Sequence, residues 1–300
     1  MLRRICDPLN SLLVAVMWMV WSLLAQAIVL GGFLVFLLVA VFGWHIPDAS
    51  LIEVVALQSD LDRSFLLLGV TSLGVLFVIV PSVRLWFGPN VREILGTQLP
   101  RREHVVFALA TVVPIAVLSN CLHEFVLKQW MTWTNLHGGT VAFSSVAELH
   151  RRCQGVPFPI LVGAMALGPA IAEELVFRGV IGKRLTSTFG IYPGILLTSI
   201  LFAVAHVSPA HAAGTLPIGI LLHWLYLKTG SIWTPILVHF CNNLLAISMV
   251  RFHLSDAIHI SPQAVVALGC YLLVILALIH HLDRAGRSKR HVTVSLGTSG

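Results

Sequence analysis

Long apolar runs separated by short polar segments make up most of this 300-residue chain. A helix needs about 20 consecutive apolar residues to cross the hydrocarbon core of a bilayer. Eight runs are candidates for such helices, although the fifth and sixth are short. They lie at 11–42, 64–88, 104–127, 158–182, 192–207, 213–228, 231–251 and 262–282. The pattern therefore predicts an all-α polytopic membrane protein with about eight transmembrane helices.

The longest polar segment, from Lys128 to Val156, separates three spans from the five that follow. We expect residues 1–150 to form an N-terminal three-span membrane region. Residues 252–300 would then comprise the last span and a basic cytoplasmic tail. From Asp283 onward the tail is polar and basic, and we expect it to be a disordered, solvated end.

The composition agrees with a membrane location. Hydrophobic residues make up 57% of the chain and charged residues 11%, whereas soluble domains are about 25% charged. So few charges cannot cover a soluble globule, which excludes an ordinary soluble enzyme. The net charge is +6, but the basic residues lie singly or in pairs between apolar runs, so we expect no nucleic-acid binding. The five cysteines form no CxxC pair and indicate neither a disulfide framework nor a cysteine metal site.

The positions of the 19 lysines and arginines predict the orientation, because short cytoplasmic loops retain positive charge. Most of them fall at the two ends of the chain and in alternate loops between the spans: Arg3, Arg4, Arg84, Arg92, Arg101, Arg102, Lys183, Arg184, Lys228, Arg284, Arg287, Lys289 and Arg290. The opposite loops hold fewer: Arg63, Lys128, Arg151, Arg152 and Arg251. We therefore expect both termini to lie in the cytoplasm.

Three ionisable residues lie in the middle of the fourth apolar run: Glu173, Glu174 and Arg178. Such residues are costly in lipid and persist mainly where they line a protein interior. In a helix, Glu174 and Arg178 share a face at the i, i+4 spacing, which predicts an ion pair. Glu173 points elsewhere, so this desolvated carboxylate is a candidate general base or acid. An ion pair that only fixes helix packing would leave Glu173 unexplained.

Two later runs carry further polar residues at membrane depth. The seventh run contains His239 and Asn243 on one helical face, about 12 and 18 Å from the cytoplasmic end at 1.5 Å per residue, close to the 15 Å found for Glu173. The fifth run ends at His206, about 20 Å deep by the same rise. Because Ser208-Pro209 stops that helix early, we expect the segment from His206 to Pro217 to be irregular backbone that lines a cavity.

The motifs Glu173-Glu174-x-x-x-Arg178, Phe202-x-x-x-His206 and His239-x-x-x-Asn243 occur on successive membrane segments. In this order they resemble the three motifs of the CPBP family, the CAAX proteases and bacteriocin-processing enzymes also called Abi. The stretch Lys228 to Ile236 is similar to that family's lead-in to its last motif. The resemblance covers roughly residues 156–251 and is closest to a type II CAAX prenyl endopeptidase.

The resemblance implies a fold of about eight helices whose catalytic core, conical or containing a cavity, lies in 156–251. It implies an intramembrane endopeptidase that hydrolyses peptide bonds of membrane-associated proteins or peptides with water activated by Glu173. Eukaryotic relatives remove the last three residues of prenylated Cys-a-a-X chains, whereas bacterial relatives mature or inactivate other substrates. We place this chain in a bacterial inner membrane as an integral multi-pass protein.

The residues suit the roles that peptide hydrolysis needs, namely a base, a group that orients water, and donors for the oxyanion. Glu173 suits the first role and His206 the second. His239 and Asn243 suit the third. The remaining motif residues, Glu174 and Arg178, would support the site as an ion pair.

A zinc ion is the alternative way to activate water. Glu173, His206 and His239 form a His₂Glu set like those of catalytic zinc sites. Against zinc, Asn243 is a poor ligand and no HExxH pair occurs in the sequence. Zinc would also occupy Glu173, the only unpaired base. We therefore favour hydrolysis without a cofactor and keep zinc as the alternative.

A non-enzymatic membrane protein is the rival hypothesis. A transporter or a bacteriocin-immunity partner could use the same buried polar cluster to bind an ion or a peptide. His223, in the middle of the sixth run, is expected to serve packing. An activity assay on Glu173→Gln distinguishes the enzyme from the binding protein.

Overall fold

The computed structural model describes residues 7–42, 64–134, 156–206, 208–254 and 260–297. Within these ranges every regular element is a helix and no strand occurs. The helices are α1 (Pro8–Phe42), α3 (Ser64–Phe87), η2 (Gly88–Asn90), α4 (Val91–Leu95), α5 (Arg102–Ala110), α6 (Val112–Thr134), α8 (Phe158–Leu161), η4 (Val162–Leu167), α9 (Gly168–Glu174), η5 (Leu175–Gly182), α10 (Lys183–Phe189), α11 (Ile191–Val204), α12 (Pro209–Thr229), α13 (Trp233–Arg251) and α15 (Pro262–Gly297). The predicted all-α fold is confirmed.

Seven helical segments of the described chain are long and apolar enough to cross a membrane. They are Pro8–Gly32, Gly74–Leu95, Arg102–Thr134, Phe158–Phe189, Pro209–Thr229, Trp233–Arg251 and Pro262–Asp283. The remaining apolar helix, α11, has 14 residues. At 1.5 Å per residue it extends about 21 Å, which is less than the hydrocarbon thickness of about 30 Å. The prediction of about eight membrane helices, with a short fifth one, therefore agrees with the structure.

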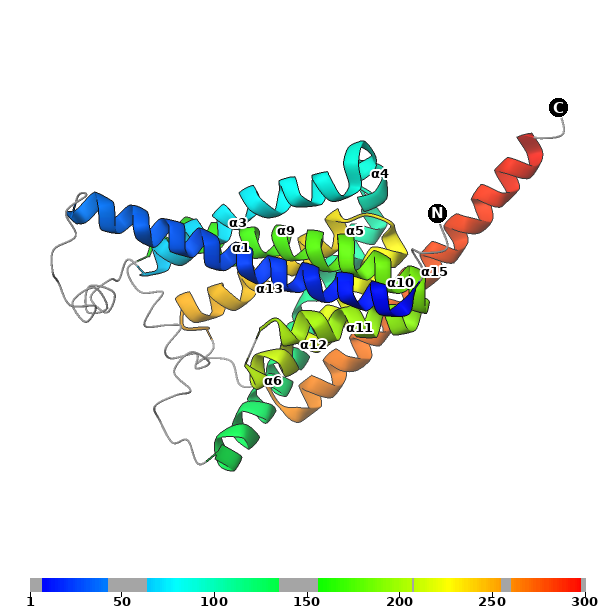
Figure 1. Ribbon diagram of the computed structural model, residues 1–300. Coiled ribbons are helices and arrows are strands. Elements are labelled where there is room, and N and C mark those ends of the chain that lie inside the picture. Colours follow the sequence, from blue (N-terminus) through cyan, green and yellow to red (C-terminus); the bar gives the residue numbers. More distant parts are fainter. Residues whose placement is uncertain (1–6, 43–63, 135–155, 207, 255–259, 298–300) are drawn as a thin grey trace.

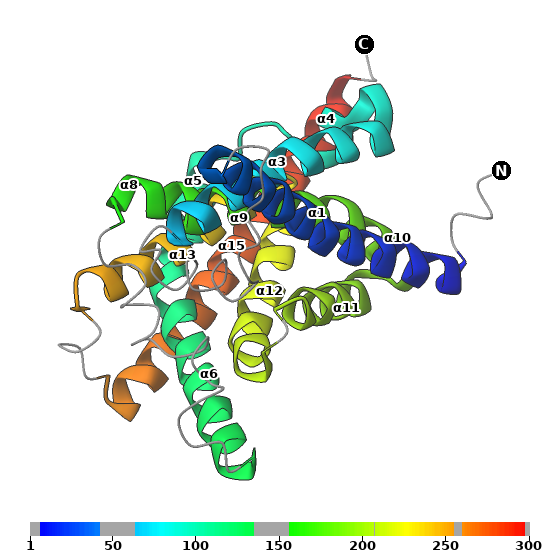
Figure 2. The ribbon, with the colours of Figure 1, turned by 60° about the vertical axis from the view of Figure 1, so that its left-hand side comes forward.

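In Figure 1 the first turn of α1 and the last turns of α15 extend toward the same side of the bundle, and the first turn of α1 lies beside α10. Figure 2 shows the same ribbon from another side. Two side-chain contacts connect elements at this end. The hydroxyl groups of Ser11 in α1 and Thr188 in α10 lie 2.8 Å apart. At the end of α12, Lys228 pairs with Asp283 of α15 at 3.6 Å. The start of α1 and the last turns of α15 therefore lie on one side of the bundle, and a cytoplasmic location of that side stays a prediction.

Two expectations about irregular backbone were wrong. The segment from His206 to Pro217 is helical from Pro209 onward, while Val207 lies outside the described residues. Proline at the first turn of a helix loses no hydrogen bond and has a helical φ, and the alanines that follow favour helix. The tail also differs, because α15 continues to Gly297.

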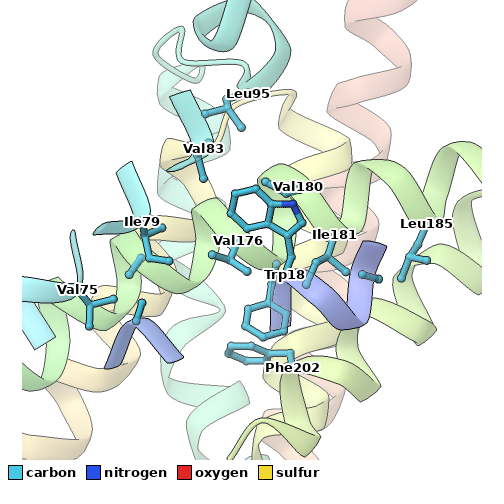
Figure 3. Packing of buried hydrophobic residues seen from close by; sticks show 14 residues of the cluster. Trp18, Val75, Ile79, Val83, Leu95, Val176, Val180, Ile181, Leu185 and Phe202 are labelled. Carbon is cyan, nitrogen blue, oxygen red and sulfur yellow. The ribbon is translucent and has the colours of Figure 1, made fainter. Parts of the chain in front are cut away.

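The first two spans pack directly against the helix that carries the Glu-Glu-x-x-x-Arg motif. Trp18 of α1 and Ile79 of α3 belong to one buried cluster with Val176 of η5 and Phe202 of α11 (Figure 3). Membrane helices associate through close packing of this kind, because lipid offers no hydrophobic drive between them. The N-terminal region therefore forms part of the wall behind the motif residues.

Two left-handed glycines meet where the α4–α5 connection touches the α12–α13 turn. Gly96 has φ +66° and Gly230 has φ +65°. A methyl group on Gly96 would overlap the carbonyl oxygen of Gly230, whereas a methyl group on Gly230 would meet open space. This close approach is possible only without a side chain at Gly96.

We expect Gly96→Ala to destabilise the protein clearly more than Gly230→Ala. The left-handed conformation costs an L-residue about 1–2 kcal/mol, and both substitutions carry this cost. Only Gly96→Ala adds a steric overlap. Gly88→Ala, at φ +65° with open space around it, is a second control for the conformational cost alone. Thermal unfolding in detergent measures the three losses, and equal losses would contradict the overlap.

Candidate active site

The helix that carries the first motif changes its winding around the site. It is π-helical in η4 and in η5, with the α-helical turns of α9 between them. Pro169 lies at the start of α9, where it lacks the amide donor that a continuous α-helix needs. Wide turns of this type are frequent at functional sites. Glu174 ends α9, and Arg178 lies in η5.

The predicted ion pair between Glu174 and Arg178 is present. Nη1 of Arg178 donates to Oε1 of Glu174 at 2.9 Å, and both side chains are completely buried. Nη2 of Arg178 donates to the carbonyl oxygen of Gly219 in α12 at 3.1 Å. The guanidinium also lies 4.3 Å from the ring centroid of Phe202. Arg178 therefore joins its own helix to α11 and α12.

His239 is the second partner of Glu174, which sequence reasoning missed. Its Nδ1 lies 2.8 Å from Oε1 of Glu174, and since a carboxylate accepts, the imidazole donates. This bond sets the orientation of the ring and leaves Nε2 free to face the site. The two residues are 65 positions apart, and the only signal in the sequence was their similar depth in two different spans.

Glu173 lies on the other side of the same imidazole. Its Oε2 is 3.9 Å from Nε2 of His239, and its side chain is 25% exposed. That oxygen is buried and has no hydrogen-bond partner within the described residues. At 3.9 Å the two atoms are too far apart for a direct hydrogen bond. Glu173 therefore contacts His239 at long range and is otherwise unpaired, as the sequence predicts.

Phe202 connects the second motif to the first and third. Its ring centroid lies 5.2 Å from that of His206 and 5.9 Å from that of His239. The side chain is 1% exposed. Sequence reasoning recognised Phe202 only as part of a motif, but the structure places it between His206, His239 and Arg178. The signal available in the sequence was an aromatic residue four positions before a histidine that lies deep in a membrane span.

His206 follows α11 directly, and its ring is held by backbone. Nδ1 lies 2.9 Å from the carbonyl oxygen of Phe202, so Nδ1 carries the donated proton and Nε2 is left as an acceptor. Asn243 lies on α13 four residues after His239, about 6 Å further along the helix, and is half-buried. The structure thus brings Glu173, Glu174 and His239 into contact around Arg178. His206 and Asn243 are nearby without a direct contact to them.

The proposed zinc set does not receive support from this geometry. Among the described residues, no group of three or more His, Cys, Asp or Glu side chains is arranged to hold a metal ion. Glu173 and His239 approach each other, but His206 is in ring contact with Phe202, as is His239, and in the described chain it has no hydrogen bond, ion pair or ring contact with Glu173 or His239. The residues therefore do not fit a His₂Glu centre as they stand.

His223 lies four residues after Gly219 on the same face of α12, where it packs against Gly182 of η5. It is completely buried, and its Nε2 lies 3.3 Å from the hydroxyl of Thr186. A methyl group on Gly182 would overlap the imidazole, so His223 fills the space that this glycine leaves. This geometry suits the packing role expected for His223.

Comparison with known proteins adds sequence evidence for part of the chain. Residues 155–245 match the family model described as type II CAAX prenyl endopeptidase Rce1-like. A protein of Bacillus subtilis named "Putative membrane peptidase YdiL" is 31% identical over 96 residues. The alignment covers 32% of this chain and 38% of that protein. No solved structure matches the chain significantly.

The matched segment begins at the end of the longest polar loop and ends two residues after Asn243, so it includes all three motifs. The first three spans lie outside it. The expected resemblance is therefore confirmed for this segment: residues 155–245 are similar to the Rce1-like type II CAAX prenyl endopeptidases.

Proposed function

We propose that this protein is an intramembrane endopeptidase in which Glu173 activates a water molecule for direct attack on a peptide bond. The observation that carries the proposal is the unequal environment of the two adjacent glutamates. Oε1 of Glu174 accepts hydrogen bonds from both Arg178 and His239, and this side chain is completely buried. Glu173 has only the 3.9 Å approach to His239 in the described structure, and its side chain is 25% exposed. The second oxygen of each glutamate is buried without a hydrogen-bond partner among the described residues. A carboxylate left free beside a histidine, inside a membrane span, suits a general base.

In the proposed reaction, Glu173 Oε2 takes a proton from water while the water oxygen forms a bond to the scissile carbonyl carbon. The carbon–nitrogen bond then breaks, and Glu173 returns the proton to the departing amine. The immediate products are a carboxylic acid and an amine, which together hold both protons of the water. Transfer of the acid proton to the amine then gives a carboxylate and an ammonium group. The free Nε2 of His206 accepts a hydrogen bond from the same water and orients it, because its Nδ1 is already used on Phe202.

The developing oxyanion needs donors in a site of low dielectric constant. Nε2 of His239 and the side-chain amide of Asn243 are assigned this role. An Nε2–H donor requires a protonated His239, since Nδ1 already donates to Glu174. The positive charges of His239 and Arg178 then balance the two carboxylates, which avoids a net charge in the membrane interior.

The substrate class follows from the depth of the site. Glu173 lies within a helix long enough to cross a membrane. The scissile bond must therefore enter the bilayer to reach Glu173. A peptide segment that is embedded in the membrane or anchored to it by a lipid meets this requirement. The name of the Bacillus subtilis relative, a membrane peptidase, supports the same class of reaction.

The test is hydrolysis by the purified protein in proteoliposomes against a panel of membrane-anchored peptides, with and without lipidation. We expect cleavage to continue after exhaustive chelation, with no stoichiometric zinc by elemental analysis, because Glu173 acts on water directly. Loss of cleavage on chelation, restored by zinc, would contradict direct activation by Glu173. No cleavage of any peptide, together with saturable binding of one, would favour the non-enzymatic alternative.

A further inference from the structure

The four consecutive backbone carbonyls from Leu95, the last residue of α4, to Gln98 all accept hydrogen bonds from the end of α12, the turn after it or the start of α13. Tyr226 Oη donates to the Leu95 oxygen at 3.1 Å, and the amide of Ile232 donates to the Gly96 oxygen at 3.0 Å. The indole N–H of Trp233 donates to the Thr97 oxygen at 2.8 Å, and the hydroxyl of Ser231 donates to the Gln98 oxygen at 2.6 Å. We name residues 95–98 the brace.

The brace supplies hydrogen-bond acceptors to the start of α13, which has no side-chain cap. The residue before this helix, Ile232, has no side chain that caps it, although the first amide groups of a helix need acceptors. The Gly96 oxygen accepts from the Ile232 amide, and Ser231 and Trp233 add two side-chain bonds on either side. The axial position of α13 is therefore held by a segment outside the motif region.

The same segment also touches the helix that carries the glutamates. The Leu95 side chain is buried in one cluster with Val176 and Val180 (Figure 3). A methyl group on Gly179, the residue after Arg178, would lie 2.7 Å from Leu95 Cδ2. One short segment thus contacts both η5 and the start of α13.

The distance from the brace to the site is short. His239 follows Trp233 by six residues, about 9 Å along α13. Its ring must keep Nδ1 at 2.8 Å from Glu174 and Nε2 at 3.9 Å from Glu173. A displacement of 1 Å in such a constellation is sufficient to lower a rate by about 100-fold.

We propose that the brace holds the start of α13 in place and so fixes His239 against Glu174. Ser231 and Trp233, which donate hydrogen bonds to the brace, are the positioning residues. The catalytic consequence rests on the function proposed above. The first three spans then contribute to catalysis through the loop that connects the second span to the third. This role explains why a segment outside the family match is packed against both motif helices.

The test is a pair of substitutions that remove donors and little bulk, Ser231→Ala with Trp233→Phe. We expect kcat to fall about 10-fold while KM stays within about 2-fold, because His239 moves and the substrate contacts remain. In a Glu174→Gln background, where the bond to His239 is already altered, the same pair should change kcat less than about 2-fold. The matched control is Trp133→Phe, since Trp133 is exposed on α6, outside the brace and the motifs.

NMR of the His239 side chain tests the brace without a measurement of activity. In ¹⁵N-histidine NMR, the Nδ1–H proton of His239 is assigned by its disappearance in His239→Gln. We expect this resonance in wild type and in Trp133→Phe, and its shift or loss in Ser231→Ala with Trp233→Phe. An unchanged resonance in that double variant overturns the proposal, as does a fall in kcat that persists in full in the Glu174→Gln background. Absence of hydrolysis by wild type would instead overturn the proposed function and leave the NMR test of the brace valid.

Discussion

Replacement of Glu173 by glutamine is expected to slow peptide hydrolysis at least about 10³-fold, within the range that general bases contribute. Glutamine keeps the size and shape of the side chain but cannot take a proton from water. The fold should remain intact, because no described residue donates a hydrogen bond to the buried Oε2 of Glu173. Initial rates in proteoliposomes measure the loss, and thermal unfolding checks the fold.

The matched control for this experiment is Glu124→Gln on α6. Glu124 is also a glutamate on a membrane helix beside a histidine, at 3.5 Å from His123, but it is 53% exposed and outside the site. Its substitution should leave the rate within about 2-fold of wild type, since it is not expected to exchange a proton with substrate. Hydrolysis by Glu173→Gln within about 10-fold of wild type would exclude Glu173 as the base.

Replacement of Arg178 by methionine is expected to destabilise the protein by about 3–5 kcal/mol, the range seen when one partner of a buried ion pair is removed. Glu174 would remain completely buried with His239 as its remaining donor. The Gly219 carbonyl would also lose the donor that joins η5 to α12. The free energy of unfolding in mixed detergent measures the effect.

The double variant Glu174→Gln with Arg178→Met separates the buried charge from lost packing. Removal of both charges should recover a large part of the stability, because no uncompensated carboxylate stays in the interior. Arg92→Met, on the exposed side of α4, is the control for the loss of an arginine as such. If the double variant is as unstable as Arg178→Met alone, packing rather than charge is the main role of Arg178.

Several features of the site were predictable because they are local along the chain. Glu174 and Arg178 are four residues apart on one helix, so helical geometry alone brings them together. The isolation of Glu173 follows from the same geometry, as it points away from that pair. The short fifth helix was predictable too, since Ser208-Pro209 interrupts its apolar run.

The contacts between helices were not predictable in the same way. His239 was assigned to the oxyanion together with Asn243, but its bond to Glu174 depends on how α13 is rotated against α9. The central position of Phe202 depends on the crossing of α11 with η5 and α13. The irregular backbone expected after His206 was wrong, because a single proline was given more weight than the helix-forming alanines after it.

By itself, the sequence determined that the chain resides in lipid, where most of its spanning helices lie, and which charged residues lie where lipid should have excluded them. It predicted a sixth run shorter than the spanning helix Pro209–Thr229. These conclusions depend on composition and on spacing within one helix, which are local quantities. Only the tertiary structure decided that His239 links the two glutamates and that residues 95–98 brace the helix carrying it. Such contacts depend on the rotation and axial position of separate helices, and these are set by packing across the whole bundle.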